Sequence, residues 1–318
     1  MTQEIPRVVG LEIGRKFVLE SSEDDYSDFL ASTIKDNNLE GLTIAIDSAN
    51  GATSYIAPKI LESLGAKVLP INHTPDGTNI NANSGSTHIN VLSKFVKSCS
   101  EKVDIGFAFD GDGDRVLAVD EKGETIDGDQ ILSVLGLDLK NKGLLKNNTI
   151  VATVMSNLGL KIFGDKENIN IATTDIGDRS VLEYMLKNDC NLGGEQSGHI
   201  ILSNYNTTGD GILTALQLSA IIKSTKTPVS QLVSKITILP QVLVNAKVNS
   251  KIKHEFAMYK EIQKAIEVLE NKFDGSGRVL IRPSGTEPLV RVMIEGIKKE
   301  EIEKDARELA NLIEDIMY

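Results

Sequence analysis

The sequence predicts an α/β protein with two consecutive α/β mixed-sheet domains, followed by a smaller α+β C-terminal domain. Short apolar runs rich in β-branched residues alternate with segments of helical spacing over residues 42–221, which is typical of β-α-β units. From residue 241 the order changes to strand, long helix, two strands and a closing helix. The length of 318 residues fits two or three domains.

The composition is that of a globular protein and excludes a disordered chain, with 41% hydrophobic and 25% charged residues. The net charge of -11 and the lack of a Lys/Arg-rich block argue against nucleic-acid binding. An acidic protein binds a phosphorylated substrate only through local devices, such as a metal ion, an arginine pair or a nest of backbone amides.

The cysteines and the apolar runs of the sequence indicate in which cellular compartment the protein is expected. Cys99 and Cys190 lie far apart and form no Cys-x-x-Cys pattern, which favours a reduced, cytoplasmic protein. The N-terminus has no apolar signal core, and no apolar run is long enough to cross a bilayer. Neither secretion nor a membrane partner is expected.

The first predicted domain, residues 22–124, follows a linker of residues 1–21. A helix is expected to begin at Ser22, with Ser22 as its cap, and to end near Asn37 and Asn38. A long polar loop is expected at residues 72–87. The remaining pattern predicts helices around residues 56–64 and 91–96, and strands at residues 42–47, 66–71, 103–109 and 116–119.

The second predicted α/β domain covers residues 125–236, and the α+β domain covers residues 237–318. The second domain is predicted to contain helices from Asp129, Ser156 and Gly177 and one through Leu213, strands at 149–155 and 169–173, and a loop at 193–199. The third is predicted to contain a strand from Gln241, a helix at 252–269, strands at 279–281 and 289–292, and a closing helix through Ile302 and Leu309.

Three carboxylates alternate with glycines at Asp110, Asp112 and Asp114, between two predicted strands. Oxygen ligands this close together favour a hard divalent cation such as Mg²⁺. A solvated Asp-Gly turn is the simpler alternative. An EF-hand would also place Glu121 at its twelfth position, but its sixth position requires Gly and is Arg115 here, and the flanks are strands.

A second device lies between the strands 279–281 and 289–292. Arg282, Ser284, Gly285 and Thr286 combine a guanidinium, two hydroxyls and a flexible glycine, a set suited to holding phosphate. Arg291 adds a second positive charge. The alternative is a Pro/Gly turn with one surface arginine.

The loop at residues 193–199 carries Glu195, Ser197 and His199, which suit hydrogen bonds to sugar hydroxyls. His199 is a candidate for proton transfer because its ordinary pKa is near neutrality, although a structural hydrogen bond is the commoner role for such a residue. Gly177 stands at a predicted helix N-terminus, where anions are favoured. The neighbouring Asp-Arg pair is equally compatible with an ordinary surface ion pair.

The aspartate loop, Gly-Glu-Gln-Ser-Gly-His at 194–199 and Arg-Pro-Ser-Gly-Thr-Glu-Pro at 282–288, in this order, resemble the α-D-phosphohexomutase family. Residues 47–52, 155–160 and 207–211 support the resemblance, which extends from about Gly14 to the end of the chain. Members of that family have four domains, and this chain resembles the second, third and fourth.

The resemblance implies phosphoryl transfer between the 6- and 1-positions of a phosphorylated hexosamine, through a phosphoserine and a bound 1,6-bisphosphate. It assigns Mg²⁺ to the three aspartates, orientation of the transferring group to Arg115, and the sugar hydroxyls to Glu195 and Ser197. The other phosphate would be held by Arg282, Ser284, Gly285, Thr286 and Arg291. Gln196 favours an amino sugar. A phosphomannomutase or phosphoglucomutase and a non-catalytic phosphosugar-binding protein remain alternatives.

One family motif is absent from these residues. The catalytic serine of the family lies in a Ser/Thr-Ala-Ser-His-Asn-Pro loop on the first domain, and residues 1–318 contain no such stretch. The nearest lookalike, residues 85–88, resembles a second-domain segment instead. The expectation is that a separate or missing N-terminal domain supplies the serine, and that this polypeptide alone does not turn over.

Overall fold

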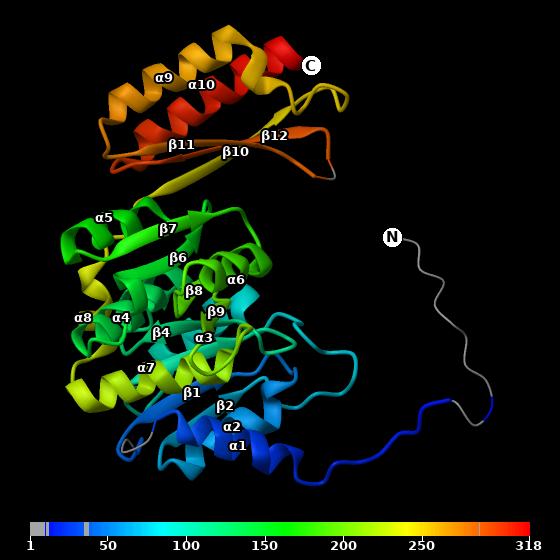
Figure 1. Cartoon of the computed structure of the whole chain (residues 1–318), viewed down its shortest axis with the longest axis vertical. Coiled ribbons are helices and arrows are strands. Elements are labelled where there is room, and N and C mark those ends of the chain that lie inside the picture. The colour runs from blue at the N-terminus through cyan, green and yellow to red at the C-terminus, as the bar shows by residue number, and fades with distance from the viewer. Residues whose placement is uncertain (1–9, 11–12, 35–37, 286) are drawn as a thin grey trace.

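The computed structural model describes residue 10 and residues 13–34, 38–285 and 287–318. Three sheets are stacked along the long axis of the molecule (Figure 1). The two N-terminal sheets are mixed and the third is antiparallel with two long helices, which confirms the predicted fold class. Among the described residues, no helix has the length and apolar character needed to cross a membrane.

The first sheet has five strands in the order β2-β1-β3-β4-β5. Its first three strands run parallel, and β3 pairs with β4 in the antiparallel sense. Strand β3 is wholly buried because helices cover both faces of its sheet, as is usual for parallel strands. The elements are α1 (Ser22–Ser32), β1 (Thr43–Asp47), α2 (Thr53–Ser63), β2 (Lys67–Ile71), η2 (Ser86–His88), α3 (Asn90–Ser98), β3 (Ile105–Phe109), β4 (Val116–Asp120) and β5 (Thr125–Ile126).

The second sheet has four strands in the order β7-β6-β8-β9. Helix α7 is buried along most of its length and packs between the first two sheets, so that both share one hydrophobic core. The elements are α4 (Gly128–Asn141), η3 (Lys146–Asn148), β6 (Thr149–Thr153), α5 (Leu158–Glu167), β7 (Asn170–Thr174), α6 (Asp178–Lys187), β8 (Leu192–Gly194), β9 (Ile200–Leu202), α7 (Gly211–Thr225), α8 (Val229–Leu232) and η4 (Val233–Lys235).

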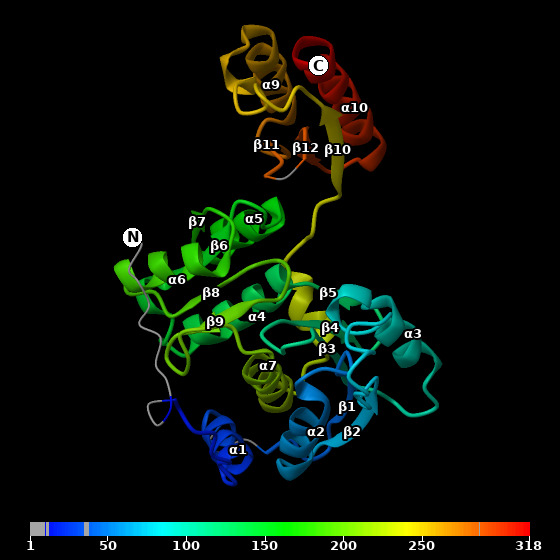
Figure 2. The same ribbon diagram turned by 90° about the vertical axis from the view of Figure 1, so that its right-hand side faces the viewer.

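The third sheet has the order β10-β12-β11 and a hydrophobic core of its own. Its two long helices cover the face turned away from the second sheet (Figure 2). Because side chains alternate along a strand, the opposite face carries the polar residues that point toward the second sheet. The elements are β10 (Gln241–Lys247), η5 (Phe256–Met258), α9 (Lys260–Phe273), β11 (Arg278–Pro283), β12 (Leu289–Glu295) and α10 (Lys299–Met317).

Several predicted boundaries are wrong. The helix expected at 252–269 begins at Lys260, because Asn249 accepts a hydrogen bond from the Lys251 amide and the chain turns before the helix. The helix expected from Ser156 begins at Leu158, with Asn157 as its cap. Ser22 is the first helical residue rather than the cap of α1, and part of that helix's predicted end, residues 35–37, lies outside the described residues.

The loop predicted at residues 193–199 is shorter than expected. Gly193 and Gly194 belong to strand β8, which forms an antiparallel hairpin with β9. Only residues 195–199 form the loop between the two strands. The hairpin fixes both ends of the loop on the second sheet.

Candidate functional site

The aspartate loop connects β3 to β4, as predicted, and brings its three carboxylates together. Each of Asp110, Asp112 and Asp114 offers one oxygen, and these three oxygens lie within 4.8 Å of one another. Gly113 has φ +80°, and a Cβ there would lie 2.7 Å from the Thr53 side chain. Glycine at this position therefore allows the chain to turn tightly beside α2.

Asp110 is held in place by the residues that follow it. It is 2% exposed, and its carboxylate accepts hydrogen bonds from the Gly113 amide at 3.1 Å and the Arg115 amide at 3.2 Å. The Arg115 Nε also donates to it at 2.6 Å. Burial opposes ionisation of Asp110, but the hydrogen bonds and the charge of Arg115 prevail and lower its pKa.

Asp114 has the opposite electrostatic environment. Burial raises its pKa, and the negative charges of Asp110 and Asp112 raise it further. Its Oδ1 atom is buried and has no hydrogen-bond partner among the described residues. The nearest cationic group to this oxygen is Arg115 Nε at 3.5 Å. Three close carboxylates, one of them with an oxygen that accepts no hydrogen bond, are an oxygen-only donor set that fits a hard divalent cation.

The 195–199 loop packs directly against the aspartate loop, although the two are far apart in sequence. The Val116 amide donates to the Gly198 carbonyl at 3.1 Å, and Arg115 and His199 form an isolated β-bridge. His199 is 4% exposed, with its Nε2 3.6 Å from the Asp114 carboxylate. The structure thus places His199 behind the metal loop rather than on an open surface.

Glu195 is oriented by the helix that follows β7. The Gly177 amide, at the start of α6, donates to Glu195 Oε1 at 3.1 Å. Gly177 has φ +110°, a conformation that favours glycine. Gly177 therefore contacts the Glu195 carboxylate, while Ser197 at the tip of the loop is exposed.

Asp127 is a further functional candidate, which the sequence motifs did not predict. It caps α4 by accepting from the Gln130 amide at 3.0 Å, and its other oxygen accepts from Gln196 Nε2 at 3.1 Å. The Asp-x-x-Gln capping pattern was a usable sequence signal for the cap. The contact with Gln196 had no such signal, because the two residues are 69 positions apart.

The phosphate-loop candidates belong to the third sheet, with Arg282 on β11, Arg291 on β12 and the others in the connection between these strands. Arg282 and Arg291 are paired residues on neighbouring antiparallel strands. Like charges directly opposite each other are destabilising, and Glu287 offsets part of this repulsion because its Oε2 lies 3.6 Å from Arg291 Nη2. Ser284 is buried and Gly285 is exposed, while Thr286 lies outside the described residues.

Lys253 supports this loop and was also missed. Its Nζ donates to the carbonyls of Ser284 at 2.5 Å, Gly285 at 3.2 Å and Glu287 at 3.3 Å. Lys253 thereby fixes the backbone of the loop and adds a positive charge next to it. Its partners are backbone carbonyls, so no side-chain pattern in the sequence pointed to it.

Family models match three consecutive parts of the chain. Residues 24–123 match the phosphoglucomutase/phosphomannomutase alpha/beta/alpha domain II. Residues 127–238 match alpha/beta/alpha domain III of the same family, and residues 243–312 match its C-terminal domain.

Two similar proteins are both named phosphoglucosamine mutase. The one from Acetivibrio thermocellus is 55% identical over 314 residues, covering 99% of this chain and 69% of the relative. The one from Ruminiclostridium cellulolyticum is 53% identical over 312 residues, covering 98% of this chain and 69% of the relative. The chain thus spans about 69% of the length of these two proteins.

Solved structures share the fold at low sequence identity. N-acetylphosphoglucosamine mutase of Aspergillus fumigatus, solved with GlcNAc-6P and magnesium, superposes with a TM-score of 0.78 at 20% identity, covering 94% of this chain and 67% of the other. A phosphoglucomutase/phosphomannomutase family protein from Burkholderia thailandensis gives 0.75 at 21% identity, covering 93% and 65%.

Proposed function

Because the chain belongs to the phosphoglucomutase/phosphomannomutase family, we propose that it carries the metal, sugar and phosphate sites of a phosphoglucosamine mutase. Such an enzyme is an intramolecular phosphotransferase that interconverts glucosamine 6-phosphate and glucosamine 1-phosphate. The observation that carries the proposal is the direct packing of the 195–199 loop against the aspartate loop. This packing supports the proposal, because the loop assigned to the sugar lies beside the loop assigned to phosphoryl transfer.

The aspartate loop provides the metal site of the proposed reaction. Asp110, Asp112 and Asp114 would hold Mg²⁺, which suits their oxygen-only donor set. When bound, this ion supplies positive charge that stabilises a phosphoryl group in transfer. Arg115 is anchored to Asp110 through its Nε, and we assign the rest of its guanidinium to orienting the transferring group.

The 195–199 loop provides the sugar contacts. Glu195, fixed by the Gly177 amide, and the exposed Ser197 would bind hydroxyls of the hexose. His199 is buried against Asp114, which supports a role in holding the metal loop rather than in contacting the sugar. Gln196, held by Asp127 beside Glu195, supports an amino sugar over the glucose or mannose phosphates used by other members of the family.

The third sheet provides the site for the phosphate that is not reacting. Arg282 and Arg291 face each other across neighbouring strands, and a bound phosphate would remove the repulsion between them. Ser284, Gly285 and Thr286 complete the proposed phosphate loop. The intact carboxylates of the metal loop argue against a purely phosphosugar-binding protein, which has no need of them.

The phosphoryl donor is the remaining part of the proposal. Residues 1–318 contain no Ser-His-Asn-Pro sequence. We infer that the phosphoserine is provided by a polypeptide segment outside these residues, and that residues 1–318 alone bind the hexose phosphate without turning it over. Cys99 and Cys190 are both free, which supports a cytoplasmic location.

Calorimetry with residues 1–318 in the presence of Mg²⁺ tests the binding part. We expect glucosamine 6-phosphate to bind more tightly than glucose 6-phosphate or mannose 6-phosphate. Arg282→Gln should weaken its binding at least tenfold through loss of a charge-assisted contact, about 1.4 kcal/mol or more. Arg307→Gln is the matched control, because Arg307 lies on the exposed side of α10 and pairs with Glu303.

The assignment would be wrong if Arg282→Gln left the affinity unchanged, or if mannose 6-phosphate bound better. A coupled assay for mutase activity tests the donor. Activity is expected only after a phosphoserine-bearing segment is added, and turnover by residues 1–318 alone would contradict that part.

A further inference from the structure

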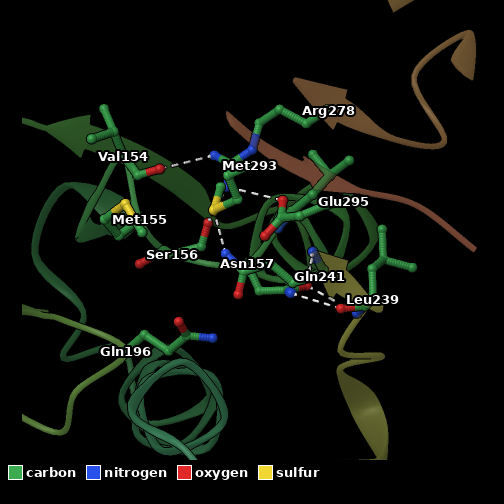
Figure 3. A network of polar contacts seen from close by, with 12 residues as sticks. Val154, Met155, Ser156, Asn157, Gln196, Leu239, Gln241, Arg278, Met293 and Glu295 are labelled. Atoms are coloured by element: carbon green, nitrogen blue, oxygen red, sulfur yellow. Dashed lines mark hydrogen bonds and ion pairs between the residues drawn. The ribbon is translucent and has the colours of Figure 1, made fainter. Parts of the chain in front are cut away.

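The polar face of the third sheet makes a second contact, away from the phosphate loop. Arg278 on β11 and Glu295 on β12 are paired residues on neighbouring strands, and they form an ion pair at 2.9 Å. Both reach the segment of residues 154–158, which runs from the end of β6 to the first residue of α5 and which we call the junction segment. Figure 3 shows the two side chains on one side of this segment and Gln196 on the other.

The contacts of this pair are directed at the backbone of the junction segment. Arg278 donates to the Val154 carbonyl at 3.2 Å and to the Ser156 carbonyl at 2.9 Å. Glu295 accepts a hydrogen bond from the Leu158 amide at 3.1 Å, at the first residue of α5. A carboxylate at a helix N-terminus is favoured by the helix dipole.

Burial makes the pair costly to break. Glu295 is 0% exposed, whereas the Arg278 side chain is 27% exposed. Removing the arginine would leave a buried carboxylate without its counter-charge. The contacts of this pair with the second domain therefore hold the third sheet in one arrangement, since sliding or rotation would separate Glu295 from the Leu158 amide and Arg278 from the Val154 and Ser156 carbonyls.

The junction segment is itself fixed by hydrogen bonds to helix α4 and to the segment that precedes β10. The Asn157 amide donates to Asp129 Oδ2 on α4 at 2.7 Å. The Asn157 side chain donates to the Leu239 carbonyl at 3.0 Å and accepts from the Leu239 amide at 2.9 Å. Leu239 precedes β10, so one asparagine ties the junction segment to the connection between the two sheets.

The same strand carries this contact and the phosphate loop. Arg278 and Arg282 are four residues apart on β11 and therefore share a face, about 13 Å from each other. A rotation of 10° about Arg278 would move Arg282 by roughly 2 Å over that distance. Displacements of about 1 Å already reduce the efficiency of an active site. Arg282 also contacts the junction segment, with its Nη1 3.4 Å from Met155 Sδ.

We propose that Arg278 and Glu295 form a latch that fixes the C-terminal sheet on the junction segment, and that this latch positions Arg282 for the phosphate of the substrate. Arg278 and Glu295 are positioning residues, since they act through the sheet. The positioning role rests on the proposed function of Arg282. The latch itself does not, because it concerns only the contact between two parts of the chain.

A distance measurement between the two sheets tests the latch. Spin labels are attached to cysteines introduced at Leu186 on α6 and Val268 on α9, which are 64% and 58% exposed, in a chain with Cys99→Ser. Cys190 is buried and can stay. We expect one narrow distance distribution for the parent chain, and a distribution at least twice as wide for Arg278→Met and for Glu295→Gln.

The matched control is Arg307→Met, which removes an exposed ion pair with Glu303 inside α10 and should leave the distribution unchanged. Glu295→Gln keeps the shape and an acceptor for the Leu158 amide, so it remains informative if Arg278→Met folds poorly. Distributions that match the parent in both latch variants would overturn the latch.

Calorimetry with glucosamine 6-phosphate and inorganic phosphate on the same variants tests the positioning role. Both latch variants should bind glucosamine 6-phosphate about tenfold more weakly than the parent, and inorganic phosphate almost as well, since only the relative placement of the sites has changed. A wide distribution with unchanged glucosamine 6-phosphate affinity would overturn the positioning role. A parent chain that binds no hexose phosphate would contradict the proposed function, while the distance measurement would still decide the latch.

Discussion

Asp112 is the carboxylate of the metal loop that can be substituted with the least effect on other contacts of the structure. Asp110 binds two backbone amides and Arg115, and Asp114 lies next to His199. Asp112 is exposed and has no hydrogen bond or ion pair within the described part of the chain. Its substitution therefore changes the metal site without removing a structural contact.

We predict that Asp112→Asn weakens Mg²⁺ or Mn²⁺ binding at least tenfold, because one of three anionic ligands is lost. The free energy of unfolding without metal should stay the same or rise slightly, since repulsion between the carboxylates falls. Mn²⁺ titration followed by electron paramagnetic resonance measures the affinity. Asp28→Asn on the exposed side of α1 is the control. Equal metal affinities of the parent, Asp112→Asn and Asp28→Asn would show that Asp112 is not a metal ligand.

At the residue scale, the sequence indicated groups whose chemistry is concentrated in a short stretch. Three aspartates in five residues, or arginine with two hydroxyls in five, are visible without a structure. Lys253 and Arg278 were not, because each acts on backbone carbonyls of a segment far away in the chain. Side-chain patterns carry no information about such partners.

At the scale of elements, the start of α4 and the 195–199 loop meet with almost no space between them. The Gly128 amide donates to the Gln196 carbonyl at 2.9 Å. A Cβ on Gly128 would lie 2.0 Å from the Glu195 carbonyl and 2.9 Å from the Gly198 amide nitrogen. The contact requires a residue without a side chain at the first position of the helix.

We predict that Gly128→Ala destabilises the protein by about 1–3 kcal/mol, as overpacking does, despite the better helix propensity of alanine. The displaced loop should also bind the sugar phosphate more weakly. Urea denaturation measures the first effect and calorimetry the second. Gly14→Ala serves as the control because a Cβ there meets nothing within 4 Å. A Gly128→Ala protein as stable as this control would show that the loop has room to move.

The sequence predicted the helices and strands that have a strong pattern of apolar residues. It did not predict an element whose structure depends on neighbouring strands. The buried strands β1, β3 and β6 are short runs made mostly of β-branched, aromatic and small apolar residues, which single them out in the sequence. Strand β8 contains two glycines and has little strand propensity of its own. It forms because β6 and β9 lie on either side of it, which is a property of the tertiary fold.

At the scale of the whole molecule, two buried acidic residues lie at the junction between the second and third sheets. Asp129 and Glu295 are both 0% exposed. Burial raises the pKa of Asp129 to about 7, with a further contribution from the charge of Asp127. Burial also raises the pKa of Glu295, although Arg278 opposes the shift. Both acids therefore favour the protonated form more strongly in the folded protein than in the unfolded chain.

This shift makes stability fall as pH rises. Unfolded Asp129 releases its proton near pH 4, whereas folded Asp129 keeps it until about pH 7. Between these values the folded state binds more protons, so the free energy of unfolding decreases with increasing pH and levels off above pH 7. Asp129→Asn keeps an oxygen for the Asn157 amide and does not titrate. From pH 5 to pH 8 we expect the parent to lose about 2–3 kcal/mol more than this variant.

Urea denaturation at pH 5, 6, 7 and 8 measures the difference, with Asp28→Asn as a control that should follow the parent at every pH. Parallel pH profiles of Asp129→Asn and the parent would mean that Asp129 is already ionised in the fold at pH 5. The Asn157 amide would then be bound by a carboxylate at all four pH values. If the predicted slope is found, the junction segment contacts a neutral acid below pH 7 and a buried anion above it. Asn157 also binds Leu239. Ionisation of Asp129 would therefore also affect the hydrogen bonds at the connection to the C-terminal sheet.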